Sequence, residues 1–281
     1  MSERIGAGYR ILFYGVIDAD GYFLGGSTTA PDAGDTDGSP LLRLEGARTL
    51  PVGIPEPEIV IVSGDDEPMV SFNFDAEDLP SGVFEQAQRD DLFEALVQGT
   101  LVDAQENIRI GVLDPADRAD VGMCMLLSRR AKRWESGSRG VSVYQHLYLP
   151  AVSIKPLGND YTQRQFNAYL YSMNLSRSDR AGWTSINDTE HGTTAASILP
   201  IESFYPLMLQ HWVGDNVETT FTLIRDRETD GSMRVYVDDV QQAETGIWTC
   251  ADESDQLVFG AAPADGARID AIWEYPEADI V

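Results

Sequence analysis

Short apolar segments, several of which alternate with polar residues, recur along the whole chain and predict a protein built mainly of β-strands. In the first three quarters of the chain we expect strands at 9–16, 22–24, 41–52, 58–62, 69–74, 82–88, 108–113, 141–149, 152–154, 165–173 and 198–211. Turn residues at 18–21 separate the first two strands. A segment at 25–40 that is rich in Gly, Asp and Thr predicts a flexible, solvated loop.

The strands at 58–62 and 69–74 are predicted to form a long hairpin. The residues that join them make its tip acidic, with Asp65, Asp66 and Glu67. Long hairpins and loops such as 25–40 and 63–68 are natural elements for reaching across to a neighbouring molecule.

Two segments predict helices. Leu92–Gln98 follows two aspartates, Asp90 and Asp91, whose carboxylates favour a helix N-terminus. A second helix is expected from Asp120 to about Lys132, with Met123, Cys124, Leu126 and Leu127 directed inward.

From Asp215 onward, short strands recur every 8 to 12 residues, a spacing typical of a small β-sandwich. These strands are expected at 218–224, 233–237, 246–250, 257–259 and 268–275. We therefore predict two domains, 1–214 and 215–281, and expect the first to fold and polymerise without the second. The predicted fold class is mainly β: a sandwich or barrel with a flanking helix, plus a small immunoglobulin-like sandwich.

Charge is distributed unevenly. The chain has a formal net charge of −26, yet residues 121–181 hold nine basic residues against three acids. The candidate contact residues in this stretch are Arg129, Arg130, Lys132, Arg133 and Arg139. The basic run 129–133 has two interpretations that are compatible: it offsets the dipole at the end of the expected helix, or it contacts an acidic face of another subunit. Nucleic-acid binding is disfavoured, because the rest of the chain would repel phosphate.

The acid excess is accompanied by only two lysines, Lys132 and Lys155, against 18 arginines. This composition suits a protein that must stay soluble in strong salt, where charge repulsion is screened. It is also what a GC-rich genome yields, so both sources stay open.

The motifs of the common enzyme and metal-site classes are missing from the sequence. It contains no G-x-S-x-G, P-loop or H-E-x-x-H pattern. The acidic loop does not fit a calcium-binding EF-hand, because placing Gly38 at position 6 puts Ala33 at position 1. Cys124 and Cys250 are expected to be buried free thiols, and the three histidines to be structural. We expect no enzyme activity, no cofactor, no metal, no secretion signal and no membrane span.

Several segments resemble structural proteins of tailed viruses. VYVDDVQQ, the strand with Trp248 and LVFGAAPADGARI resemble a small β-sandwich that recurs in virion proteins. The preceding part is similar to the major tail (tail tube) proteins of long-tailed phages. That likeness lies in PVGIPEPEIVIVSGDDEPMVSF, DDLFEALVQGT, the RRAK run and YLYSMNLSRSDRAGW.

The resemblance implies a virion structural protein that stacks as hexameric rings and forms the conduit for viral DNA during ejection. It implies that the partners are further copies of the chain and other tail proteins, such as terminator, tape measure and baseplate. The DNA would pass without specific binding, and the C-terminal sandwich would decorate the tube exterior. The protein would be made in the host cytoplasm and reside in the virion tail. The alternatives are another virion protein of the head or tail, such as a decoration protein, and a surface-adhesion β module.

Overall fold

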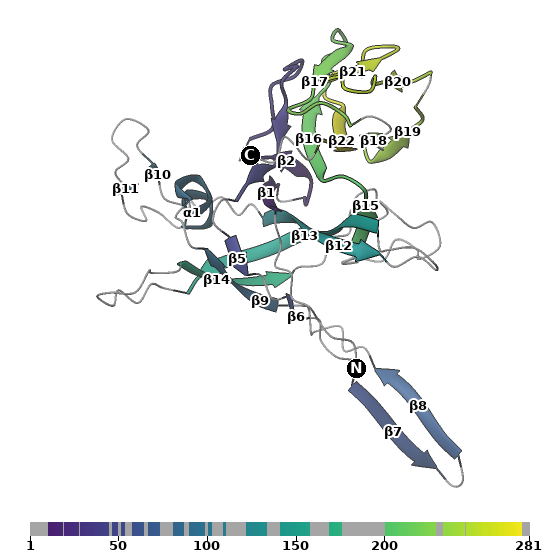
Figure 1. Cartoon of the computed structure of the whole chain (residues 1–281). Coiled ribbons are helices and arrows are strands. Elements are labelled where there is room, and N and C mark those ends of the chain that lie inside the picture. Colours follow the sequence, from purple (N-terminus) through teal and green to yellow (C-terminus); the bar gives the residue numbers. More distant parts are fainter. Residues whose placement is uncertain are drawn as a thin grey trace.

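The structure is a computed structural model and confirms a mainly β chain (Figure 1). It describes residues 11–18, 20–27, 29–44, 47–49, 52–53, 58–64, 67–73, 81–86, 90–98, 101–102, 109–110, 122–133, 141–157, 169–175, 200–228, 233–244 and 246–276.

A ten-stranded antiparallel sheet forms the centre of the molecule. Its main path is β2 (Phe23–Gly25), β1 (Ile11–Ile17), β12 (Gly122–Arg133), β13 (Val141–Pro156), β14 (Tyr169–Leu175), β9 (Ser81–Gln86) and β5 (Ala47–Thr49). Three short strands pair beside this path: β4 (Leu42–Arg43) on β1, β15 (Pro200–Ser203) on β13, and β6 (Val52–Gly53) on β9. The two ends of the path do not pair, so the described strands form an open sheet and not a barrel.

The prediction of a helix from Asp120 to about Lys132 is wrong, because β12 occupies most of this segment. β12 pairs with β1 on one side and with β13 on the other. Its residues 123–128 are all buried, because both faces of the strand are covered. A strand buried on both faces has no polar side and therefore shows no alternation, which is why the apolar run looked helical.

The expected helix at 92–98 is confirmed as α1 (Asp91–Gln98). The Asp90 carboxylate accepts a hydrogen bond of 3.0 Å from the backbone N–H of Phe93, which is N-terminal capping. Phe93 is completely buried and meets Tyr14 of β1 and Tyr171 of β14 edge-on, with ring centroids 5.0 and 5.3 Å away. α1 thus covers one face of the central sheet with an aromatic contact.

The C-terminal part is a β-sandwich, as predicted. One sheet has the order β19 (Val240–Gln242), β18 (Met233–Val237), β22 (Arg268–Glu274), β16 (Leu207–Val213) and β3 (Ser39–Pro40). The other has the order β17 (Thr220–Thr222), β21 (Gln256–Phe259) and β20 (Trp248–Thr249). Aromatic residues of the two sheets pack between them, and the ring centroids of Trp212 and Phe221 are 6.1 Å apart.

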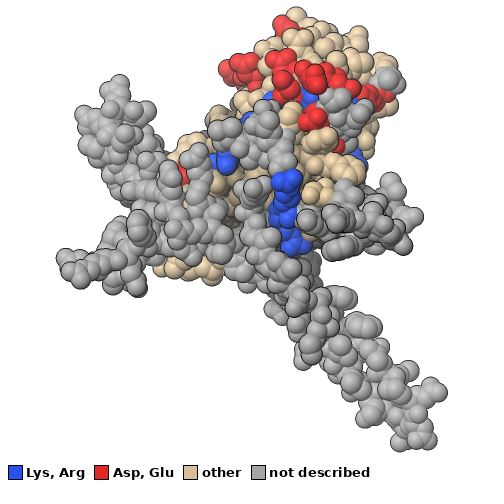
Figure 2. All heavy atoms as spheres, viewed as in Figure 1, with Lys and Arg blue, Asp and Glu red and all other residues tan. Residues whose placement is uncertain are grey.

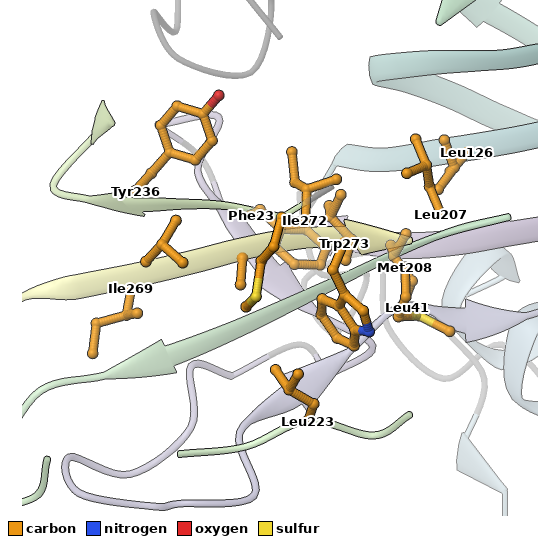
Figure 3. Packing of buried hydrophobic residues seen from close by; sticks show 14 of the residues in the cluster. Phe23, Leu41, Leu126, Leu207, Met208, Leu223, Tyr236, Ile269, Ile272 and Trp273 are labelled. Atoms are coloured by element: carbon orange, nitrogen blue, oxygen red, sulfur yellow. The ribbon is translucent and has the colours of Figure 1, made fainter. Parts of the chain in front are cut away.

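One hydrophobic core joins this sandwich to the central sheet. It contains Leu126 of β12 and Leu207 of β16, which lie close together in Figure 3, and continues to Ile269 and Trp273 of β22. β16 precedes Gly214 but pairs along its full length with β22. The division of roles between 1–214 and 215–281 stays a prediction, but a cut at Gly214 would pass through this sheet.

The loop at 25–40 is irregular up to β3, as expected, but its described residues are fastened to the sandwich. The carbonyl of Thr36 accepts hydrogen bonds from the Trp212 indole and from the backbone of Thr222. Gly38 has a φ of 59° and lies so close to Trp212 that a Cβ would clash with the indole ring. This turn therefore requires glycine for both its conformation and its packing.

Replacing Phe93 by alanine should lower the free energy of unfolding by about 3–5 kcal/mol, because a fully buried aromatic residue leaves a cavity beneath the helix. Urea denaturation measures this change. Leu92→Ala is the matched control: Leu92 is the preceding residue of α1 and is 51% exposed, so its loss should cost less than about 1 kcal/mol. Equal effects of the two variants would contradict the packing described here.

A chain cut after Gly214 should lose solubility or cooperative unfolding, in contrast to the independence expected from composition. The cut removes β22, leaving β16 with an unpaired edge and Trp212 without Phe221. Soluble yield and circular dichroism melting test this. A chain cut after Pro276 keeps every described strand and should behave like the full chain. A well-folded 1–214 fragment would instead support the predicted domain boundary at Gly214.

Candidate assembly surfaces

The basic run 129–133 lies at the end of a strand and not at the end of a helix. Arg129 and Arg130 are both exposed on β12. Successive residues of a strand lie on opposite faces, so Arg129 and Arg133 share one face while Arg130 and Lys132 share the other. The interpretation as compensation of a helix dipole is therefore wrong. The interpretation as a subunit contact stays a prediction, with the charges divided between two faces.

The surroundings of the basic run are described only in part. The Arg129 guanidinium donates two hydrogen bonds, of 2.9 and 2.6 Å, to the side-chain oxygen of Gln145, which is its cross-strand partner on β13. These two hydrogen bonds hold the Arg129 guanidinium against Gln145, while the Arg129 side chain as a whole stays exposed. The side chains of Lys132 and Arg133, and the whole of Arg139, lie outside the described part of the chain.

The predicted hairpin is confirmed as β7 (Glu58–Gly64) and β8 (Glu67–Asn73). The register pairs Gly64 with Glu67. Asp65 and Asp66 lie outside the described residues, so of the acidic tip only the backbone of Glu67 is described. Figure 1 shows the hairpin projecting away from the central sheet as a separate two-stranded ribbon.

Register gives the hairpin two apolar faces. Ile59 pairs with Phe72 and Ile61 with Val70, so these four residues share one face. The opposite face contains the pair Val62 and Met69. A two-stranded hairpin on its own is at best marginally stable in water.

The C-terminal sandwich presents an acidic surface. Red side chains gather over this part of the molecule in Figure 2. The exposed acids of this region are Asp32, Asp35, Asp37, Asp226, Asp238, Glu244, Asp252, Glu253, Asp255 and Asp265.

Arginines of the sandwich are engaged by the chain's own groups. Arg227 donates hydrogen bonds to Glu244 and to the Cys250 carbonyl, and Arg268 lies 3.6 Å from the centre of the Tyr22 ring. The acids around them therefore dominate the local field, which would repel phosphate and other anions.

A part of the central sheet lies open on the face opposite α1. Three neighbouring strands contribute to this open face, which we define as Val83, Ser153, Lys155, Leu157, Leu170, Ser172 and Asn174. Leu157, Leu170 and Val83 are 53%, 39% and 43% exposed, whereas Ile154, Tyr171 and Met173 on the reverse face are buried.

Sequence analysis did not identify this surface. The signal was present, since Leu170, Ser172 and Asn174 alternate with Tyr171 and Met173, but alternation alone does not show that the outer face is left uncovered.

A buried polar chain joins three strands of the central sheet. His146 of β13 lies 2.7 Å from Ser128 Oγ of β12 through Nδ1 and 2.7 Å from Ser203 Oγ of β15 through Nε2. Ser203 Oγ donates to the Tyr205 carbonyl, so it must accept from Nε2–H. Nδ1 is then the acceptor for the hydroxyl of Ser128.

A serine beside an imidazole is the arrangement of a nucleophile and its base. Here Ser128 is 0% and His146 1% exposed, so a substrate has no access to the pair, and its role is structural. Burial lowers the pKa of His146 to about 4, an effect only partly opposed by the Tyr205 carbonyl.

A second buried polar group lies where the central sheet meets the sandwich. His211 Nδ1 of β16 donates to Asp270 Oδ1 of β22 at 2.7 Å, and both side chains are 1% exposed. Cys124 is buried nearby, and its burial raises the pKa of the thiol to about 12. Cys250 is a buried free thiol too, so the expectation for both cysteines is confirmed. His191 lies outside the described residues.

Within the described ranges, no group of three or more His, Cys, Asp or Glu side chains is placed to hold a metal ion. None of the described helices is long and apolar enough to cross a membrane. The chain matches no family model, no curated protein and no solved structure.

Acid should destabilise the fold through His146. The unfolded histidine binds a proton below about pH 6.5, while the folded one resists protonation until about pH 4. The contribution of neutral His146 to the free energy of unfolding is therefore fully present above pH 6.5. It is lost as the pH falls, by about 3 kcal/mol at pH 4. Urea titrations across this range measure it. His146→Gln lacks the titrating ring, so its own acid-induced loss should be smaller than that of the parent. Parallel curves would contradict the assignment.

Proposed function

We propose that this chain is a major tail tube subunit of a tailed virus. In this proposal six copies form a ring. The rings stack head to tail into the conduit through which viral DNA leaves. The C-terminal sandwich lies on the outside of the tube. The chain acts as a structural protein without catalysis, and its partners are its own copies and other tail proteins.

The observation that carries the proposal is the β7–β8 hairpin. It projects from a large sheet as a ribbon with apolar residues at both of its faces. Any apolar surface that such a ribbon left in water would cost about 25 cal/mol for each Å². Burial against another copy of the chain removes that cost. Because the hairpin and its receiver are different surfaces, the contact is heterologous and generates rings or filaments.

Charge distribution supports the same function. The whole chain has a net charge of −26, and the ring-forming part shares in this acid excess, since residues 1–214 carry more acidic than basic side chains. DNA passing such an assembly finds few cations that could release its counterions, so it is not retained. Strong contacts between subunits must then offset the mutual repulsion of the copies, and exposed Arg129 and Arg130 are candidates for these contacts.

The alternatives are another virion structural or decoration protein of the head or tail and a surface-adhesion module. Each would leave purified protein monomeric or in small closed oligomers. Size-exclusion chromatography with light scattering, followed by negative-stain imaging, separates these outcomes. We expect stacked rings or long tubes from the full chain, with six copies in each ring. A strictly monomeric protein at all salt concentrations would remove the proposal.

Reversal of the basic run should abolish assembly while the fold survives. Changing Arg129, Arg130, Lys132 and Arg133 to Glu adds eight negative charges to each subunit, so attraction to an acidic neighbour becomes a repulsion that costs several kcal/mol per interface. Imaging and light scattering should show monomers, with an unchanged circular dichroism spectrum.

The two pairs that share a face, Arg129 with Arg133 and Arg130 with Lys132, should also be reversed separately, because only the face in contact should matter. Measurements belong at low salt and at 1 M, where the Debye length is about 3 Å and only close pairs are felt. If all variants polymerise like the parent at both salt concentrations, the basic run is a solvated strand end and makes no contact.

A further inference from the structure

We infer that residues 200–206 form an acid-sensitive joint between the central sheet and the sandwich, and that this joint opens when His146 takes up a proton. The segment, which we call the strap, consists of β15 and the residues 204–206 that lead into β16. Figure 1 shows β15 beside β13, and β16 within the sandwich. The joint lies within one chain, so its opening does not depend on assembly.

The strap is attached to both parts of the molecule. On the sheet side, β15 pairs with four residues of β13, and the Ser203 hydroxyl accepts a hydrogen bond of 2.7 Å from His146 Nε2–H. On the sandwich side, the Phe204 N–H donates to the Glu274 carboxylate at the end of β22. His146 therefore helps to hold the strap to the sheet, while β22 holds it to the sandwich.

Protonation of His146 conflicts with the direction of its hydrogen bonds. Nδ1 accepts from the Ser128 hydroxyl, and Nε2–H donates to Ser203, whose own proton goes to the Tyr205 carbonyl. A proton added at Nδ1 would face the hydroxyl proton of Ser128. It would also place a positive charge on a side chain that is 1% exposed, and burial of a charge is costly. Burial accordingly lowers the pKa of His146 to about 4.

The titratable and charged groups that the central sheet places around His146 do not favour a cation there. Tyr144 stacks on the imidazole, with ring centroids 6.2 Å apart, and Tyr148 lies two residues along the same strand. On β12, Arg130 lies two residues from Ser128 and so shares its face of the sheet. The nearest charge on these two strands is therefore of the same sign as an imidazolium.

The strap and the sandwich contribute Tyr205 and Glu274. The Tyr205 carbonyl opposes the effect of burial on the pKa of His146, but it does so only in part. The Glu274 carboxylate is 6% exposed and accepts the Phe204 N–H, so this hydrogen bond holds the strap and not the imidazole. Glu274 is the second titratable group at the joint, and the test below separates it from His146.

The strap is the side from which water can reach the imidazole. β12 and β13 are strands of 12 and 16 residues, whereas β15 has four. Phe204 is 63% exposed, and Ser203 and Tyr205 are half-buried. Lifting the strap breaks the His146–Ser203 hydrogen bond and a short ladder, and it lets the protonated ring donate to water. Hydration of the imidazolium then offsets the loss of these contacts.

The coupling between proton uptake and opening has a definite sign and size. In the open strap the imidazole meets water, so its pKa returns to about 6.5, against about 4 in the closed strap. Opening is therefore favoured as the pH falls below 6.5. Linkage raises the ratio of open to closed strap by about 30-fold between pH 7.5 and pH 5.

Hydrogen exchange of the full chain, measured by mass spectrometry, tests the joint. Peptides that cover 200–206 are compared with peptides from α1, which packs on the other face of the sheet. Acid slows the intrinsic exchange of both kinds of peptide alike, so this effect cancels in their ratio. Opening of the strap relative to α1 should rise about 30-fold from pH 7.5 to pH 5. An equal rise in both, which indicates global unfolding, or no rise in the strap would overturn the inference.

Two variants identify the group that senses the acid. His146→Gln does not titrate but keeps an acceptor for Ser128 and a donor for Ser203, so the opening of its strap should change less than about twofold. Glu274→Gln is the matched control, because it removes the buried carboxylate and keeps an acceptor for the Phe204 N–H. It should respond like the parent. A response that is lost in Glu274→Gln and kept in His146→Gln would overturn the role of His146.

The test does not depend on the folding of His146→Gln. The ratio of strap to α1 exchange in the parent already decides whether acid opens the strap alone. Ser203→Ala gives a second comparison, since it removes the acceptor of His146 Nε2–H and should open the strap at pH 7.5. A strap that stays as closed in Ser203→Ala as in the parent would overturn this hydrogen bond as the attachment.

Discussion

Burial of the β12–β13 pair on both faces is the constraint on which the rest of the structure depends. On one face, Met125 and Leu127 lie in the core that α1 closes with Phe93. On the other, Cys124 and Leu126 lie in the core shared with the C-terminal sandwich. A strand pair without a solvent-exposed face must be covered on both faces. The helix and the sandwich are therefore held in place by the same two strands.

Cover on the second face stops before the end of the sheet, and this gives the molecule its asymmetry. The sandwich covers the region of β1, β12 and the first half of β13, while Ser153, Lys155 and Leu157 at the end of β13 are exposed. Polar residues buried under the covered part are satisfied internally, as His146 is by Ser128 and Ser203. The exposed part has instead a mixture of leucine, valine and small polar residues, with Leu157 53% and Val83 43% exposed.

The sequence predicted correctly those elements whose formation depends on residues that are close together in the chain. The cap at Asp90 predicted α1, and alternation in 69–74 predicted β8. β12 was missed because its second face is buried by residues far away in the chain, a fact that no local window contains. The same limit hid the open face, since alternation of Leu170 with Tyr171 indicates two faces but not which of them stays uncovered.

Strand geometry also changes how charge at the end of β12 can act. A basic run on a helix end would concentrate four cations on one turn, but successive positions of a strand, such as those of Arg129 and Arg130, lie on opposite faces. If copies of the chain assemble as proposed, neither side alone would offset a net charge of −26, so attraction through Arg129 or Arg130 would not be the main cohesive term between them. Apolar contact would then have to supply most of the cohesion. Among the described residues, exposed apolar side chains that could offer such contact lie on the open face, at Leu157 and Leu170, and on the C-terminal sandwich, at Val217 and Val240.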